Sequence, residues 1–153
     1  MSEIKSILES AEKQCEKNSS RLTPKRKKIL QTLLKSKKAL SAYEIADIFN
    51  KKSTDPIPTM SVYRILDFLE EEELVHKLKL ANKYIACSHI SCSHSHSIPQ
   101  FLICKECNEV SEISIDIDTM KKIQKKVEDE NYHLVKPQLE MHCICNICDQ
   151  LNK

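Results

Sequence analysis

Paired cysteines give this 153-residue chain its clearest chemical pattern. Cys104 and Cys107 form one Cys-x-x-Cys pair, and Cys145 and Cys148 form another near the C-terminus. A turn with this spacing directs two thiolates at one ion, and a second such turn completes a tetrahedral four-sulfur site that suits Zn²⁺. Four protein ligands leave no position for a water molecule. The spacing therefore predicts a closed, structural zinc site.

Further metal-binding side chains lie between Tyr84 and Cys107. Cys87 stands near the start of this segment, and the run Cys-Ser-His-Ser-His-Ser covers residues 92–97. Taken alone, His76 fits a hydrogen-bonded core histidine, but beside Cys87 and this run it becomes a candidate ligand. Cys92 with His89 or His94 forms either a further weak metal site or a set of spare exposed ligands, and no role is assigned to His142 and Cys143.

The composition is that of a soluble, intracellular protein. Hydrophobic residues make up 41% of the chain and charged residues 30%. No apolar stretch approaches the ~18 residues that span a bilayer, and no leader pattern is present, so we expect a cytoplasmic protein with no membrane association. Thiols stay reduced in that compartment, so the cysteines are interpreted as metal ligands and not as disulfides. A thioredoxin-like redox pair lacks its strand-helix setting.

Charge is distributed unevenly along the chain. Residues 21–69 hold eleven Lys/Arg and four Asp/Glu, a net charge of +7, whereas residues 81–153 hold eight and ten, a net charge of −2. This asymmetry indicates that the first half meets a polyanion. The chain has no glycine, so we expect Asn and Asp to occupy positions with positive φ.

The first half has the pattern of a winged helix-turn-helix. Apolar spacing predicts a helix over residues 2–18, with Cys15 as a buried core thiol. Further helices begin at Thr23-Pro24, at the capping box Ser41-Ala-Tyr-Glu44, and at Pro58-Thr59. Two alternating runs, 74–80 and 83–86, then predict a β-hairpin. In this arrangement a later helix enters the DNA major groove.

The second half predicts a β-β-α-β unit, which completes an α+β fold class. Strands are expected at 100–103 and 110–117, a helix after Asp118, and a last strand over about 132–141 with Pro137 favouring an edge position. A unit of this size has only a small core, so zinc binding and dimerisation would supply the rest of its stability. The predicted domains are a winged-helix DNA-binding domain (1–86), a hinge and metal-binding loop (87–99), and a dimerisation domain with structural zinc (100–153).

Several motifs, in this order, resemble the ferric uptake regulator (Fur) family and, within it, the zinc uptake regulators. The resemblance covers about residues 4–148, and the residues that carry it are RLTPKRKKIL (21–30), ALSAYEIADIF (39–49), SVYRILDFL (61–69), LVHKLKLANKYIAC (74–87) and FLICKEC (101–107). Members of this family are dimeric, metal-dependent repressors with an N-terminal winged helix and a C-terminal dimerisation domain. The resemblance therefore implies a homodimeric, zinc-responsive repressor of zinc-uptake genes, with no enzymatic activity and no small-molecule substrate.

The resemblance also implies a second, regulatory zinc site. Its ligands carry over to His76, Cys87, a loop histidine and Glu112. The loop after Cys87 is longer than in the family pattern, so counting forward from Cys87 and counting backward from Cys104 give different positions for the histidine ligand. His96 lies between these two positions and is the preferred ligand, followed by His94 and then by His89. Mixed Cys/His/carboxylate ligands suit Zn²⁺ better than iron. Each subunit is then expected to bind one structural and one regulatory zinc ion.

DNA contacts are expected on the fourth helix and its neighbour. Tyr63 can stack on a thymine methyl and Arg64 can bond a purine edge, and Tyr43 and Ser61 match family contact positions. A dimer of this kind fits a palindromic, AT-rich operator. Two departures from the family are Pro137, where iron-sensing relatives have a histidine, and Met60-Ser61 before the Val-Tyr-Arg motif.

Two alternatives remain open from the sequence. The abundance of histidine in the loop favours an iron- or peroxide-responsive regulator of the same family. The spare cysteines and the histidine-rich run favour a metalloenzyme or a zinc-buffering protein, neither of which needs a helix that bears Tyr63 and Arg64.

Overall fold

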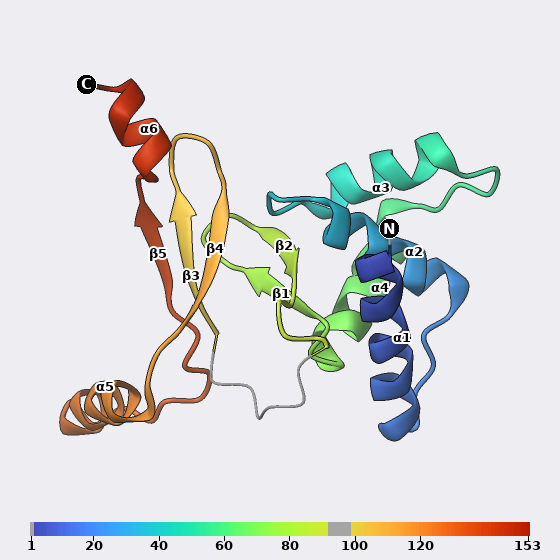
Figure 1. Ribbon diagram of the computed structural model, residues 1–153. Coiled ribbons are helices and arrows are strands. Elements are labelled where there is room, and N and C mark those ends of the chain that lie inside the picture. The colour runs from blue at the N-terminus through green and yellow to red at the C-terminus, as the bar shows by residue number, and fades with distance from the viewer. Residues whose placement is uncertain (1, 92–98) are drawn as a thin grey trace. The chain divides into compact units, whose positions relative to one another are not determined.

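The computed structural model describes residues 2–91 and 99–153. Its contacts divide the chain into two compact units, Met1–Cys92 and Ser93–Lys153. Within the described residues, the first unit holds four helices and a two-stranded hairpin, and the second holds a three-stranded sheet with two helices (Figure 1). The predicted α+β fold class is confirmed.

The helices of the first unit begin where turn chemistry predicts. Pro24 is the first residue of its helix. The Ser41 hydroxyl accepts a hydrogen bond from the Glu44 N–H at 3.1 Å, and the Glu44 carboxylate accepts one from the Ser41 N–H at 2.6 Å, which completes the capping box. No helix within the described residues has the length and apolar character to cross a membrane. The four helices are α1 (Ser2–Lys17), α2 (Pro24–Lys35), α3 (Ala42–Lys52) and α4 (Thr59–Glu71).

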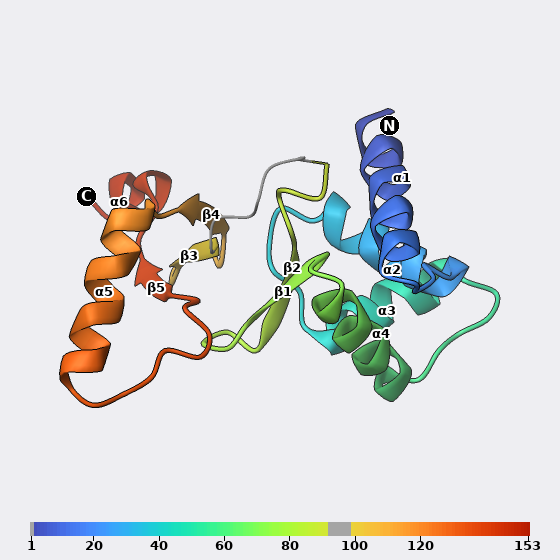
Figure 2. The same cartoon turned by 90° about the horizontal axis from the view of Figure 1, so that it is seen from below.

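One hydrophobic core holds these helices and the hairpin together. Each helix contributes apolar residues at helical spacing, and Ile29, Leu30 and Leu66 are fully buried. Cys15 is part of this core, as expected, and its burial raises the pKa of the thiol. Figures 1 and 2 show the four helices grouped with the hairpin, so that the core lies among elements far apart in the sequence.

The hairpin is formed by β1 (Val75–Leu78) and β2 (Lys83–Ala86), which pair antiparallel with His76 opposite Ile85. It is also joined to the helices. Leu40, just before α3, exchanges backbone hydrogen bonds of 3.0 and 2.8 Å with Tyr84 on β2. The hairpin is therefore the wing of a winged helix-turn-helix, fixed at its base to the segment that leads into α3.

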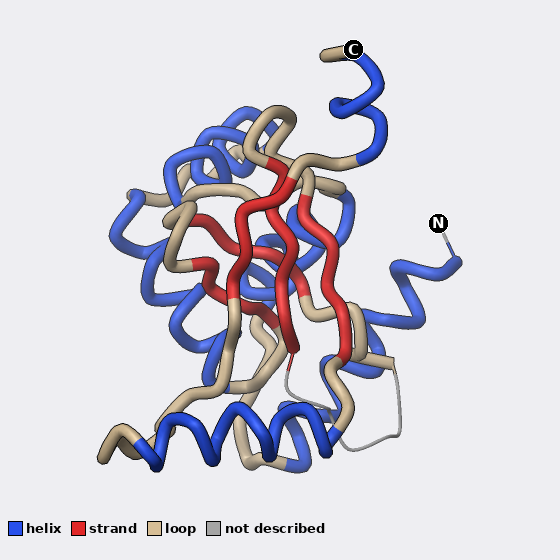
Figure 3. The backbone as a smooth tube through the Cα atoms, turned by 90° about the vertical axis from the view of Figure 1, so that its left-hand side faces the viewer, coloured by secondary structure: helices blue, strands red, loops and turns tan. Residues whose placement is uncertain are grey.

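The second unit is a three-stranded sheet in the order β4-β3-β5 (Figure 3). Strand β3 (Pro99–Cys104) pairs antiparallel with β4 (Val110–Ser114) and parallel with β5 (Glu140–Cys143). Helix α5 (Ile117–Asp129) connects β4 to β5, and α6 (Asn146–Leu151) follows β5. The β-β-α-β order agrees with the sequence prediction, whereas α6 was not predicted.

Two predicted boundaries in this unit are wrong. The last strand covers only 140–143. The buried Gln100 side chain donates a hydrogen bond to the Pro137 carbonyl at 2.9 Å and accepts one from the Leu139 N–H. Because these side-chain bonds hold the residues before Glu140, the strand begins later than predicted. Ile117 belongs to α5 and not to β4. The Asp116 carboxylate accepts the Thr119 N–H at 2.8 Å and starts the helix, which leaves Ile117 73% exposed.

Left-handed backbone occurs without glycine. The described residues with positive φ are Ser19, Glu73, Asn82, Asn108 and Asn131. Asparagine takes three of these positions, as expected, while aspartate takes none. Glu73 follows α4, and the next residue closes that helix end with a 2.9 Å hydrogen bond from Leu74 N–H to the Leu69 carbonyl. The bond that closes the helix offsets the steric cost of the left-handed residue.

Candidate metal centres and DNA-binding surface

The two Cys-x-x-Cys pairs meet in the second unit. Cys104 ends β3, Cys107 lies in the turn after it, Cys145 precedes α6, and Cys148 lies in α6. The four sulfur atoms all lie within 4.8 Å of one another, and the Sγ atoms of Cys107 and Cys145 are 3.9 Å apart. Two sulfurs on a tetrahedral Zn²⁺ with Zn–S bonds of 2.3 Å are separated by about 3.8 Å. The donor set and its spacing therefore fit zinc.

Local backbone bonds place the first pair. The Cys104 N–H donates to the Glu109 carbonyl, and the Asn108 N–H donates to the Cys104 carbonyl, both at 2.9 Å. Asn108 has φ of 60°, which lets the chain turn back sharply after Cys107. The parallel pairing of β3 with β5 then sets Cys104 opposite Cys143, so the second pair follows two residues later at the same end of the sheet.

The four thiols differ in how readily they ionise. Backbone N–H groups of Cys107 and Cys145 lower the pKa of the Cys104 thiol to about 6, and the Cys145 N–H lies 3.4 Å from its sulfur. A hydrogen bond with the Cys145 side chain, together with burial and the nearby Cys107 and Cys104 sulfurs, raises the pKa of Cys148 to about 12. The negative charge of one thiolate disfavours ionisation of the neighbouring thiols, so a cation is required for all four to be ionised together.

A second pair of ligand groups lies at the base of the wing, inside the first unit. A ring nitrogen of His76 on β1 and the Cys87 sulfur just after β2 lie within 4.8 Å of each other. Cys87 is 4% exposed, and its N–H donates to the Leu74 carbonyl at 3.0 Å. The hairpin register produces this proximity, because His76 faces Ile85 and Cys87 is two residues further along.

The other predicted ligands are distributed over both units and the loop between them. Glu112 lies on β4, in the second unit, and is half-buried. His89 follows Cys87, and its Nδ1 lies 3.2 Å from the Ser88 hydroxyl. His94, His96 and Cys92 lie outside the described residues. His142 and Cys143 lie on β5.

The predicted DNA-contacting residues gather on α3 and α4. Tyr43 on α3 is 69% exposed and meets Tyr63 on α4 edge to face, with ring centroids 6.4 Å apart. Ser61 and Arg64 lie on the same helix as Tyr63, and Arg64 is exposed. Sequence reasoning named these residues but not the Tyr43–Tyr63 contact, because α3 and α4 are brought together only by the core.

Comparison with known proteins places the chain in a family. The family model described as the ferric uptake regulator family matches residues 17–151. The chain belongs to the ferric uptake regulator family. The predicted family is therefore confirmed, and its members are regulators of transcription and not enzymes.

Relatives and solved structures agree with this family over most of their lengths. The zinc uptake regulation protein of Escherichia coli (strain K12) is 33% identical over 144 residues, which is 93% of this chain and 81% of that protein. A zinc uptake regulator solved in complex with zinc and DNA matches 97% of each chain at 27% identity, with a TM-score of 0.86. The holo structure of XcZur is 31% identical and covers 94% of this chain and 96% of its own, with a TM-score of 0.78.

One feature of this Fur-family chain was missed by sequence reasoning. A cavity lies between α2 and α3, and three lysines are among its lining residues, Lys28, Lys35 and Lys52. Lys28 and Lys35 are seven residues apart and therefore share one helix face, which is the signal the sequence offers. Lys52 lies on another helix, and only the packing of α2 against α3 brings it to the same cavity.

Proposed function

We propose that this chain is a zinc-responsive transcriptional repressor that binds an operator as a homodimer. The observation that carries the proposal is the joint presence, within one compact unit, of two features: the contact between exposed Tyr43 and half-buried Tyr63, and the proximity of the buried Cys87 thiol to the half-buried His76 imidazole. The first suits DNA bases and the second suits a metal ion. A unit with both can couple a metal to DNA recognition.

The exposed side of α4 carries the proposed recognition chemistry. Arg64 can donate two hydrogen bonds to a guanine edge, and the aromatic rings of Tyr43 and Tyr63 can contact thymine methyl groups. The net charge of +7 over residues 21–69 supports attraction to the phosphate backbone. A homologous zinc uptake regulator was solved with DNA, which supports the same partner here.

The ligand types favour zinc over iron at the proposed regulatory site. Cys87 supplies a soft thiolate and His76 an imidazole, and this combination suits Zn²⁺. The resemblance adds Glu112 and a loop histidine, His96 or His94, to complete four ligands. The E. coli relative is named as a zinc uptake regulation protein and the DNA-bound structure as a zinc uptake regulator, which supports zinc as the metal sensed.

The proposed ligands explain how a metal would control DNA binding. His76 and Cys87 belong to the wing and its exit, whereas Glu112 belongs to the sheet of the second unit. When bound, zinc supplies coordinate bonds that join ligands from both units. His76 is then held on the hairpin and Glu112 on β4, so the spacing of the two recognition helices in a dimer becomes fixed. Without this constraint, ordering the units opposes DNA binding.

The four-cysteine cluster is proposed to have a different role. It lies wholly inside the second unit, where it joins the β3–β4 turn to α6. Its role would be to hold that unit folded as the dimerisation domain, with one structural and one regulatory zinc ion per subunit. Helix α5 has no buried residue, so its half-buried Met120, Ile123 and Val127 remain available to a second copy of the chain.

A DNA-binding assay at buffered metal concentrations tests the proposal. The zinc-loaded protein is first used to retain fragments from a genomic DNA pool, and binding to a retained duplex is then measured by fluorescence anisotropy against free Zn²⁺, Fe²⁺ and Mn²⁺. We expect zinc to promote binding at a far lower free concentration than the other two metals. Equal potency of iron would contradict the zinc assignment, and failure to retain any specific sequence would favour zinc buffering.

Matched cysteine variants locate the sensing site. Cys87→Ser is expected to remain a folded dimer that has lost the zinc-dependent step in DNA affinity. Cys143→Ser, which changes a thiol that lies outside both proposed ligand sets, is expected to respond to zinc as the unmodified protein does. His96→Ala is expected to resemble Cys87→Ser, and His94→Ala to be milder. A monomeric or unfolded Cys87→Ser protein would contradict the division between the two sites.

A further inference from the structure

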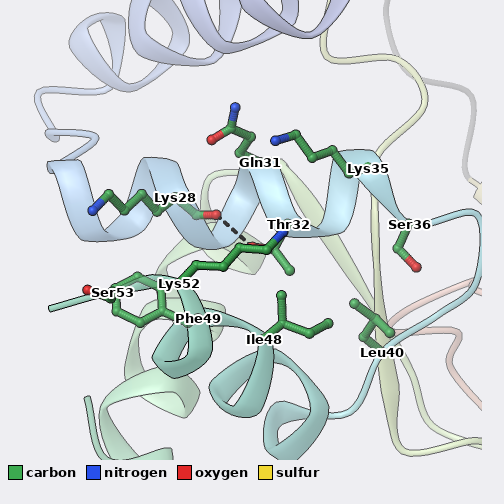
Figure 4. A pocket seen from close by; sticks show the side chains of 10 residues that line it. All are labelled: Lys28, Gln31, Thr32, Lys35, Ser36, Leu40, Ile48, Phe49, Lys52 and Ser53. Carbon is green, nitrogen blue, oxygen red and sulfur yellow. Dashed lines mark hydrogen bonds between the residues drawn. The ribbon is translucent and has the colours of Figure 1, made fainter. Parts of the chain in front are cut away.

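A cavity of about 370 Å³ lies between α2 and α3, within the first unit (Figure 4). One side is apolar and is formed by Leu40, Ile48 and Phe49. Its other lining residues are polar or cationic: Lys28, Gln31, Thr32, Lys35, Ser36, Lys52 and Ser53. The volume falls in the range of ~300–1,000 Å³ that is usual for small-molecule pockets, and an apolar surface with a few polar groups is the usual lining of such pockets.

The three lysines of the cavity differ from neighbouring lysines in their ion pairs. Lys27 on α2 is paired with Glu12 at 2.7 Å, and Lys51 on α3 is paired with Asp47 at 2.8 Å. Among the described residues, no ion pair is formed by the three lysines that line the cavity, Lys28, Lys35 and Lys52. The charge of Lys28 helps to lower the pKa of Asp55, but the direct ion pair of Asp55 is with Lys25 at 2.8 Å. An anion in the cavity would therefore still reduce the mutual repulsion of the three lysines.

The aromatic ring of Phe49 adds to this arrangement. It is 5% exposed, and the Lys28 Nζ lies 5.9 Å from its ring centroid. Among the described residues that line the cavity there is no aspartate or glutamate. Apolar surface therefore lies directly beside cationic groups, a combination that favours a ligand with an apolar body and a negative charge.

We propose that the α2–α3 cavity binds a small organic carboxylate with an aromatic or branched apolar body. The apolar body packs on Leu40, Ile48 and Phe49, and the carboxylate accepts hydrogen bonds from the ammonium groups of Lys28 and Lys52. The cavity contains no residue of α4, β1 or β2. The ligand is thus separate from half-buried Tyr63, from exposed Arg64 and from the His76–Cys87 pair, and it contacts the last turn of α3 instead.

Binding is tested on the full-length, zinc-loaded protein with 2-naphthoate as the probe. Titration into ¹⁵N-labelled protein is expected to give saturable shifts of the backbone amides of residues 28–36, Leu40 and residues 48–53. The uncharged 2-naphthamide, which has nearly the same shape, is expected to bind several-fold more weakly. If 2-naphthamide binds as tightly as 2-naphthoate, or if the saturable shifts fall outside these residues, the proposal is overturned.

Charge-matched variants separate the cavity from general electrostatics. The double variant Lys28→Gln/Lys52→Gln is expected to weaken naphthoate binding about fivefold to tenfold. Lys27→Gln/Lys51→Gln removes the same charge from the same two helices outside the cavity, and is expected to change it less than about twofold. Equal losses of naphthoate affinity in the two double variants would show that overall charge, and not the cavity, determines binding, and this would overturn the proposal. A short DNA duplex that displaces the naphthoate would assign these lysines to phosphate contacts, which also overturns the proposal.

Discussion

The first unit buries twenty side chains in one hydrophobic core, whereas the described residues of the second unit bury only Gln100, Phe101, Ile103 and Cys104. All four lie on the central strand β3. Neither α5 nor α6 has a buried residue. Because the free energy of folding comes mainly from buried apolar surface, the first unit can fold by its core and the second needs other contributions.

The cysteine cluster is the contribution that we propose for the second unit in place of a core. It connects the β3–β4 turn to α6 across about 40 residues of sequence, with Cys104 and Cys145 in direct contact through a 3.4 Å N–H···S hydrogen bond. A structural zinc ion contributes ~10–16 kcal/mol to folding in small zinc domains. That is comparable with the whole ~5–15 kcal/mol stability of an ordinary domain. On this proposal the first unit is stabilised by its apolar core and the second by metal coordination.

Loss of one thiol from the cluster is expected to have the largest effect. Cys104→Ser, or removal of zinc by a strong chelator, should unfold the second unit and abolish dimerisation while the first unit stays folded. Hydrogen exchange measured by mass spectrometry reports on the folding of both units at once. Protection should be lost over residues 99–151 and kept over residues 4–90. Loss of protection in both units would show that the first does not fold on its own core.

Removing a buried side chain from the core of the first unit is the converse test. Leu66→Ala removes a fully buried side chain of α4 and is expected to lower the free energy of unfolding of the first unit by ~2–5 kcal/mol. Denaturant unfolding followed by circular dichroism measures this change, and zinc content and dimerisation should be unaffected. Leu80→Ala, at a residue that is 54% exposed, is the matched control and should change stability little.

Acidification should weaken the second unit before the first. The pKa of Cys148 is raised to about 12 by the Cys145 side chain and by burial, and the pKa of Cys107 is also raised, so both thiols carry protons at neutral pH. Zinc binding must displace at least these two protons, and its apparent affinity should fall at least about a hundredfold per pH unit. Below about pH 6 Cys104 also becomes protonated, and the dependence steepens.

Chelator competition between pH 8 and pH 5.5 measures this dependence, with the unfolding midpoint of the first unit followed in parallel. Its apolar core should make that midpoint much less sensitive over the same range. A zinc affinity independent of pH would mean that the thiols are already ionised without metal.

The smallest expected effect concerns Gln100, the one buried polar side chain among the described residues of the second unit. Gln100→Leu removes the hydrogen bonds that hold Pro137 and Leu139 before β5, and should destabilise this unit by ~1–3 kcal/mol. Thermal unfolding of the zinc-loaded dimer is the measurement. Gln138→Leu, a change of the same type at a half-buried neighbour, serves as the control. A stability unchanged by Gln100→Leu would leave the late start of β5 at Glu140 unexplained.

The sequence by itself determined the family, the fold class and the order of most elements. Pro24 and the Ser41–Glu44 capping box marked helix starts because these signals act through backbone groups only a few residues away. The four-cysteine cluster was also predictable, since two residues of spacing fix the reach of each thiol pair. The ligand roles at His76, Cys87, Glu112 and the loop histidine remain predictions, as do the DNA contacts and the domain boundaries.

Tertiary packing decided the rest. Gln100 lies 37 residues from Pro137, so no local pattern revealed that its side chain would bind the residues before the last strand and that the strand would begin only at Glu140. Asp116 started α5 at Ile117 because its carboxylate could cap the helix, which overrode the alternation of isoleucines. The Tyr43–Tyr63 contact and the cavity with Lys28 and Lys52 each join two helices. Their geometry depends on how the core packs those helices together, and it cannot be predicted from residues that are adjacent in the sequence.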